Sequence, residues 1–165
     1  MFYSSTLFQM LTSDAIISDD KKYRYLLTRI WDNDKRMVNF IGLNPSTADQ
    51  IDNDPTMRRC IAFAKSWGYG GLYMTNLFAY RTSKPEELMK SKNPIGKEND
   101  KYLLEIEKKV DAVVFAWGAN GTFLNRDKQV LNLISKGYYI ALTKDKHPRH
   151  PLYLKANLTL KRHCF

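Results

Sequence analysis

Short apolar runs alternate with amphipathic segments along most of this chain. Nearly continuous apolar runs, typical of buried strands, occupy residues 38–43, 72–77, 111–118 and 138–143. Between them, apolar residues recur at the spacing of one helix face. We expect helices at residues 55–67, 84–89, 96–109 and 123–135. This alternation of strand and helix predicts right-handed crossovers and parallel strands packed between two layers of helices.

The amino-terminal part of the chain has a different pattern. Residues 23–31 are rich in aromatic and β-branched residues, and residues 32–35 have the composition of a turn. We therefore expect residues 23–31 to pair with residues 38–43 as an antiparallel hairpin, and the pattern allows a further short strand at residues 13–18. The fold class predicted is a single three-layer α/β/α sandwich with a mainly parallel sheet of about four strands plus this amino-terminal antiparallel hairpin.

Length and composition favour one globular domain over residues 1–165, because 165 residues suffice for one core and no linker or repeat interrupts the chain. No apolar run approaches the length of a membrane span, and the amino terminus lacks the layout of a signal peptide. A cytoplasmic location is therefore expected.

The chain carries a formal net charge of +9, which favours a polyanionic partner. Lysine and arginine side chains that neutralise phosphates release counterions, so nucleic acid, and DNA in particular, is the expected partner. A soluble basic protein without such a partner is the alternative. The two cysteines, Cys60 and Cys164, give no metal-ligand spacing and are too few for a four-cysteine iron–sulfur cluster. We expect no metal and no cofactor.

Polar residues follow three of the predicted strands. Asn44 comes after the first apolar run, Asn76 ends the second, and a loop with His147 and His150 follows the fourth. The carboxyl ends of parallel strands lie on one rim of a sheet, so these side chains should converge on one site. Each also has a structural explanation, because asparagine shapes turns and caps helices, and His-Pro pairs shape loops.

Four segments in this order resemble motifs of the uracil-DNA glycosylase superfamily. Residues 42–45, Gly-Leu-Asn-Pro, resemble the first motif of its mismatch-specific branch, and residues 113–118 resemble a buried strand that ends in Trp-Gly. Residues 75–76 resemble the strand end whose asparagine reads the base edge, and residues 150–154 are similar to the second catalytic motif. The resemblance covers residues 37–158. Residues 42–49, 53–56 and 76–81 resemble still more closely an uncharacterised bacterial and phage family of unknown function, which the resemblance places as a relative of those glycosylases.

The resemblance implies a DNA glycosylase-like hydrolase that cleaves the N-glycosidic bond of a flipped uracil or modified base. Asn44 would then orient the attacking water, because an amide is no general base at neutral pH. A histidine would donate a hydrogen bond to the departing base, and the amide of Asn76 would read a pyrimidine edge. Ser46 stands where uracil-specific enzymes have an aromatic gate against thymine, so the identity of the base stays open.

Several roles have alternatives. His150 is favoured over His147 as the catalytic histidine, because the apolar and aromatic residues after it match the motif better. Asp49 or Asp54 could supply the general base that Asn44 cannot, although Asp54 is also a good helix cap. A non-catalytic nucleic-acid or nucleotide-binding module on the same fold, or an enzyme acting on a free nucleotide or nucleoside, remains a rival interpretation.

The remaining candidates are binding residues. Phe78 and Tyr80 offer rings for a base to stack on, unless they belong to the core. Arginines can contact phosphates bidentately or merely form a solvated surface, and the candidates are Arg58, Arg59, Arg81 and Arg149. Leu152 and Tyr153 are candidates for the wedge that fills the gap left by a flipped base.

Overall fold

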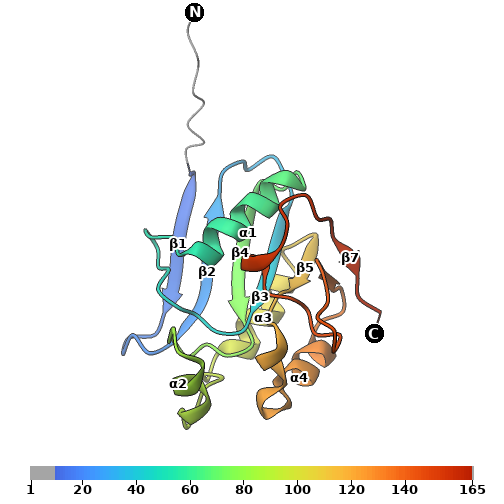
Figure 1. The fold of residues 1–165 in the computed structure, drawn as a ribbon. Coiled ribbons are helices and arrows are strands. Elements are labelled where there is room, and N and C mark those ends of the chain that lie inside the picture. The colour runs from blue at the N-terminus through green and yellow to red at the C-terminus, as the bar shows by residue number, and fades with distance from the viewer. Residues whose placement is uncertain (1–9, 165) are drawn as a thin grey trace, which may run out of the picture.

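The computed structural model describes residues 10–164, and within them the chain forms a mixed α/β fold around a seven-stranded sheet (Figure 1). The strand order is β1-β2-β4-β3-β5-β6-β7. The strands are β1 (Thr12–Ile17), β2 (Arg24–Ile30), β3 (Met37–Gly42), β4 (Gly71–Asn76), β5 (Ala112–Phe115), β6 (Tyr138–Tyr139) and β7 (Lys161–Arg162).

Parallel and antiparallel pairings both occur in this sheet. β3 pairs in parallel with β4 and β5, and β5 pairs in parallel with β6. β1 with β2, β2 with β4, and β6 with β7 are antiparallel. The sheet is therefore wider and more mixed than the sequence predicts, because antiparallel strands extend the parallel group on both sides.

The predicted hairpin between residues 23–31 and 38–43 is wrong. β2 pairs with β1 and with β4, so β4 separates it from β3. The physical reason is that β4 pairs in parallel with β3 along the whole of both strands and so takes the place beside β3 that β2 would need. A hairpin does form near the amino terminus, but it joins β1 to β2. β1 lies where the sequence allows a further short strand, at residues 13–18.

The helices are α1 (Pro55–Ser66), α2 (Pro85–Lys90), α3 (Asn99–Glu107) and α4 (Arg126–Leu133), with 3₁₀ turns η1 (Ala119–Asn125) and η2 (Pro151–Tyr153). The start of α1 follows the prediction, since the Asp54 carboxylate accepts a hydrogen bond from the Met57 N–H and Pro55 occupies the first turn. Figure 1 shows η2 beside α1, far from it in sequence.

Helices cover both faces of the sheet. Val114 of β5 belongs to a core cluster with residues of α1, whereas its neighbours Val113 and Phe115 pack with residues of α3 and α4. Successive residues of a strand point to opposite faces, so a continuously apolar strand requires this double cover. Among the described residues, no helix combines the length and the apolar character needed to cross a membrane.

Several predicted elements are shorter than expected, and two of them change the path of the chain near the site. The helix expected at residues 123–135 starts only at Arg126, because Leu124 and Asn125 have φ angles of 53° and 57° that break a right-handed helix. The strand expected at residues 138–143 ends at Tyr139, since the chain then turns back: Thr143 N–H donates to the His147 carbonyl at 2.8 Å. This turn brings the loop with His150 toward the sheet.

Candidate active site

A cavity of about 550 Å³ lies at the carboxyl ends of β3, β4 and β5. Its lining combines residues that follow β3, the end of β4, the residues after β5, the start of α1 and the turn η2. Five of the catalytic and base-binding candidates from the sequence line it together: Asn44, Ser46, Asp54, Asn76 and His150. The convergence expected from parallel strand ends is therefore present in the structure.

The orientation of the Asn44 amide is fixed by backbone carbonyls. Its Nδ2 donates hydrogen bonds to the carbonyls of Thr82 at 2.8 Å, Pro45 at 3.1 Å and Tyr80 at 3.3 Å. Only the nitrogen of an amide can donate, so this arrangement settles which end of the side chain is which. Within residues 10–164, Asn44 Oδ1 has no hydrogen-bond partner and remains an acceptor for a ligand or a water.

Asn76 contributes a buried amide whose Nδ2 has no hydrogen-bond partner among the described residues. Gly42 makes room for it, since a Cβ at that position would lie 2.7 Å from Asn76 Oδ1. An unpaired buried amide is unfavourable by about 1–3 kcal/mol, so such a group is expected to meet a ligand or water.

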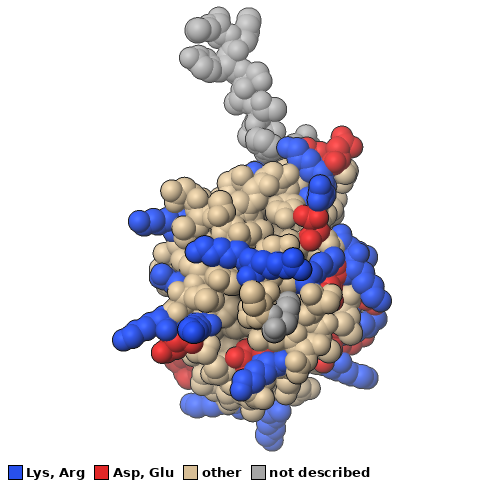
Figure 2. Space-filling model, turned by 90° about the vertical axis from the view of Figure 1, so that its right-hand side faces the viewer, with Lys and Arg blue, Asp and Glu red and all other residues tan. Residues whose placement is uncertain are grey.

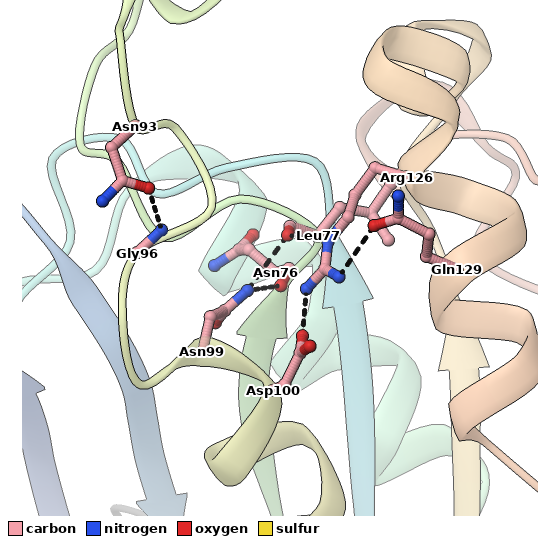
Figure 3. A network of polar contacts seen from close by, with 8 residues as sticks. All are labelled: Asn76, Leu77, Asn93, Gly96, Asn99, Asp100, Arg126 and Gln129. Atoms are coloured by element: carbon pink, nitrogen blue, oxygen red, sulfur yellow. Dashed lines mark hydrogen bonds and ion pairs between the residues drawn. The ribbon is translucent and has the colours of Figure 1, made fainter.

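A polar network holds the backbone at the end of β4 (Figure 3). Asn99 Nδ2 donates to the carbonyls of Asn76 at 2.9 Å and Leu77 at 3.0 Å, and Arg126 Nε donates to Leu77 at 2.8 Å. Arg126 also forms an ion pair with Asp100. The network comes from α3 and α4, on the side of the sheet opposite α1, and fixes the strand from which the Asn76 side chain projects.

His150 lines the cavity, and one of its ring nitrogens is engaged within its own loop. Its Nδ1 accepts a hydrogen bond from the Leu152 N–H at 3.2 Å, so the neutral ring carries its proton on Nε2. Burial lowers the pKa of His150 from its ordinary value, and the nearby Asp54 opposes this shift only in part. Gly118 N–H donates to the Pro148 carbonyl at 2.8 Å and anchors the loop beside β5.

Asp54 contributes a carboxylate to the same cavity. It lines the cavity while one of its oxygens accepts the Met57 N–H at 2.8 Å as the cap of α1. Asp49, the other predicted carboxylate, is not part of the lining. It accepts hydrogen bonds from the N–H groups of Asp52 and Ile51, which lower its pKa, and it therefore shapes its own loop.

Three further candidates lie outside the cavity lining. His147 is tied into the turn after β6, where its N–H donates to Thr143 Oγ1 at 3.0 Å. Phe78 is fully buried in the core and packs against Phe123. Tyr80 packs edge-to-face against Tyr23, so its ring lies against the protein. The structure thus does not bring these side chains together with Asn44.

The four predicted phosphate-binding arginines also lie outside the lining. Arg58 Nη1 donates to the Asn53 carbonyl at 2.7 Å, and Arg81 Nη1 donates to the Lys21 carbonyl at 3.2 Å. The Arg59 guanidinium lies 5.0 Å from the centre of the Phe63 ring. Arg149 is exposed on the loop before His150.

Sequence reasoning missed several lining residues, among them Arg24, Met57, Trp117 and Asn120. Arg24 and Trp117 are 3% exposed. In the sequence, Arg24 resembles an ordinary polar position of a strand that alternates between buried and exposed residues. Only the aromatic and apolar residues around it, from Tyr23 to Leu26, indicate that it is buried. Of the wedge candidates, Leu152 and Tyr153 both line the cavity, and Tyr153 is 79% exposed.

Comparisons with known proteins give one family. No curated protein and no solved structure matches the chain. A family model matches residues 24–152. This range contains the carboxyl ends of the strands that border the cavity and extends into η2. In residues 10–164, no three His, Cys, Asp or Glu side chains form a group that could hold a metal ion. Because the matched range covers most of the chain, the protein belongs to the family described as "Protein of unknown function (DUF1643)".

Proposed function

We propose that this protein is a DNA glycosylase-like hydrolase that removes a flipped uracil or modified base from DNA. The observation that carries the proposal is the meeting of three side chains with unused hydrogen-bonding atoms in one cavity. These atoms are Oδ1 of Asn44, the side-chain amide of Asn76 and Nε2 of His150. A cavity of about 550 Å³ is large enough for a nucleoside.

The chemistry of base release matches these atom types. Cleavage of an N-glycosidic bond builds positive charge on the sugar and negative charge on the departing base. Asn44 Oδ1 accepts a hydrogen bond from the attacking water and directs it to the sugar carbon. Nε2–H of His150 donates to the base as negative charge develops, and the neutral imidazole favoured by burial keeps that single proton in place.

Asn76 provides base recognition in this proposal. Its amide offers a donor pair and an acceptor, which complement the carbonyl and N–H groups along a pyrimidine edge. The Asn99 and Arg126 contacts hold the backbone of β4, so the amide is positioned before the base enters. Ser46 leaves space that an aromatic gate would fill, and a base larger than uracil is therefore part of the proposed substrate class.

The proposal includes the relation to the uracil-DNA glycosylase superfamily. The parallel group β4-β3-β5-β6, with Asn44 after β3 and His150 after β6, is the part of the fold that we assign to the four-stranded sheet of those enzymes. Lysines and arginines are scattered over the face nearest β7, with acidic residues among them (Figure 2). With the net charge of +9, this distribution suits non-specific attraction to DNA.

A panel of oligonucleotides with uracil, mismatched or modified bases tests the proposal, in single- and double-stranded form. The expected result is alkali-labile abasic sites with at least one base. Salt-sensitive binding of the same oligonucleotides without base release would instead favour the non-catalytic binding module. Base release from a free nucleoside alone would favour the enzyme of free nucleosides.

A further inference from the structure

Three arginines are buried among residues 10–164, and they differ in how their hydrogen bonds are satisfied. Arg24, Arg29 and Arg126 are each 3% exposed or less. Arg29 donates from Nε to Asn53 Oδ1 at 2.9 Å and from its other nitrogens to backbone carbonyls. All three guanidinium nitrogens of Arg126 likewise have partners. These two arginines are structural clamps, and neither lines the cavity.

Arg24 is the exception. Its Nη1 donates to the Ala48 carbonyl at 2.8 Å, whereas its Nε is buried without a partner. Within residues 10–164, its Nη2 has no hydrogen-bond partner either. Nε and Nη2 form one edge of the planar guanidinium, and this edge binds two oxygens of a carboxylate or phosphate side by side. Arg24 lines the same cavity as Asn76.

The charges around Arg24 determine what it can attract. Burial lowers its pKa to about 10, so the guanidinium stays protonated at neutral pH. Asp54 is the carboxylate that most opposes this shift, and Arg81 and Arg29 add positive charge nearby. Asp54 is not within ion-pair distance of Arg24 among the described residues and is engaged in capping α1. A buried cation with an unused edge is therefore left to pair with a ligand.

We infer that Arg24 is an oxyanion-binding residue of the cavity and that the substrate carries a carboxylate or phosphate that meets its Nε–Nη2 edge. This inference rests on the proposed function, which identifies the ligand as a nucleotide. It narrows the class of substrates that the protein accepts. The oxyanion has two possible sources, the phosphate of the nucleotide or an acidic substituent on the base. Both present the paired oxygens that the guanidinium edge matches.

Binding of three small probes by calorimetry separates these sources without requiring cleavage. The probes are 2′-deoxyuridine, 2′-deoxyuridine 5′-monophosphate and 5-carboxy-2′-deoxyuridine. We expect one of the two charged probes to bind on the order of tenfold more tightly than deoxyuridine, since a charge-assisted bidentate contact contributes at least this much. The charged probe that binds more tightly than deoxyuridine identifies the source of the oxyanion. Equal affinities for all three, or no binding of any at millimolar concentration, overturn the inference.

Two variants test the residue itself. Arg24→Lys keeps the charge but removes the fork, so the preference for the charged probe over deoxyuridine, measured within this variant, should fall to about twofold or less. Asp54→Asn keeps a capping side chain and removes the opposing charge, so that preference should rise. Arg162→Lys, an exposed position on β7, is the matched control. A preference that survives in Arg24→Lys and does not rise in Asp54→Asn contradicts the inference, and the wild-type comparison stands even if Arg24→Lys does not fold.

The outcome is separable from that of the proposed function. A preference for a charged probe without base release from any oligonucleotide would retain the oxyanion site and remove the glycosylase. Base release from oligonucleotides together with equal affinities for the three probes would retain the glycosylase and remove the role of Arg24.

Discussion

The N–H of Leu152 donates a hydrogen bond to Nδ1 of His150 at 3.2 Å, and this contact sets the proton of the neutral imidazole on Nε2. The residue two positions after the histidine thus fixes the tautomer of the neutral ring. The same contact caps the short turn η2, so the geometry of the loop and the protonation of the ring are set together.

The first prediction concerns the stability of the protein against pH. The pKa of His150 lies below its unfolded value of 6.5, mainly because of burial. The unfolded chain therefore binds this proton at a higher pH than the native protein does. Stability should fall as the pH decreases through 6.5 toward the lower native pKa, and this contribution should be constant above that window.

Thermal melting of wild type and His150→Asn between pH 5 and pH 8 measures this effect. Asparagine retains an acceptor for the Leu152 N–H but does not titrate in this range. The variant should show a shallower loss of stability below pH 6.5. Identical pH profiles for the two proteins would show that His150 titrates alike in the native and unfolded states.

The second prediction concerns Asn44. Asn44→Asp should destabilise the protein by about 1–3 kcal/mol, because a carboxylate oxygen would replace the Nδ2 that faces the carbonyls of Thr82 and Tyr80. Chemical denaturation measures the loss, with Asn120→Asp as a control, since Asn120 is exposed at the cavity. Wild-type stability of Asn44→Asp would mean that the amide is oriented the other way.

The third prediction concerns the room that Gly42 leaves. A methyl group there would lie 2.7 Å from Asn76 Oδ1, so Gly42→Ala should displace the amide. Affinity for a substrate base should fall by about tenfold, which corresponds to one or two hydrogen bonds, with a smaller effect on turnover. Steady-state kinetics on an active oligonucleotide provide the test, and an unchanged KM would remove Asn76 from base recognition.

The fourth prediction separates the two members of an ion pair. Arg126 is 2% exposed, whereas the side chain of Asp100 is 54% exposed. Arg126→Gln should therefore destabilise the fold by about 1–3 kcal/mol, because the Leu77 carbonyl loses one of its two buried donors and keeps only Asn99. Asp100→Asn should change stability by less than about 1 kcal/mol. Equal effects in urea denaturation would contradict the assignment of Arg126 as a clamp on β4.

The fifth prediction concerns the two cysteines. Cys60 is fully buried in α1, and burial raises the pKa of its thiol, whereas Cys164 is exposed. A thiol reagent should modify Cys164 rapidly and Cys60 only after unfolding, since the thiolate is the reactive form. Mass spectrometry of native and denatured samples checks this order, and rapid modification of Cys60 in the native protein would indicate that α1 opens locally.

The strands of the parallel group were predictable, because runs such as residues 38–43 are apolar on both faces. Their carboxyl ends locate Asn44, Asn76 and His150 without any structure. The partners of β2 were not predictable from residues 23–31. Alternation within a strand reports which residues are buried but does not identify the neighbouring strand, and a short polar turn does not require a hairpin.

Arg24, one of the missed lining residues, shows the limit of pattern reading. Arg24 lies in a strand, and period-two patterns do not distinguish a buried cation that faces a cavity from one that faces water. Its neighbours Ala48 and Asp54 come from a loop and a helix cap that are distant in the chain. Phe78 and Tyr80 were expected as stacking surfaces but lie outside the cavity lining. Aromatic residues near a strand end are more often core residues than stacking surfaces.

The product balance of one reaction separates base release from binding alone. An oligonucleotide that carries the best base of the panel is incubated with wild type, Asn44→Ala or Asn132→Ala, and free base and abasic sites are quantified together. Asn132 is the control, because it is exposed on α4 and does not line the cavity. We expect equal amounts of both products with wild type and with Asn132→Ala, and a rate on the order of a hundredfold lower with Asn44→Ala at similar oligonucleotide affinity. Unchanged base release by Asn44→Ala, or no release by the wild type from any base, would contradict the proposed function.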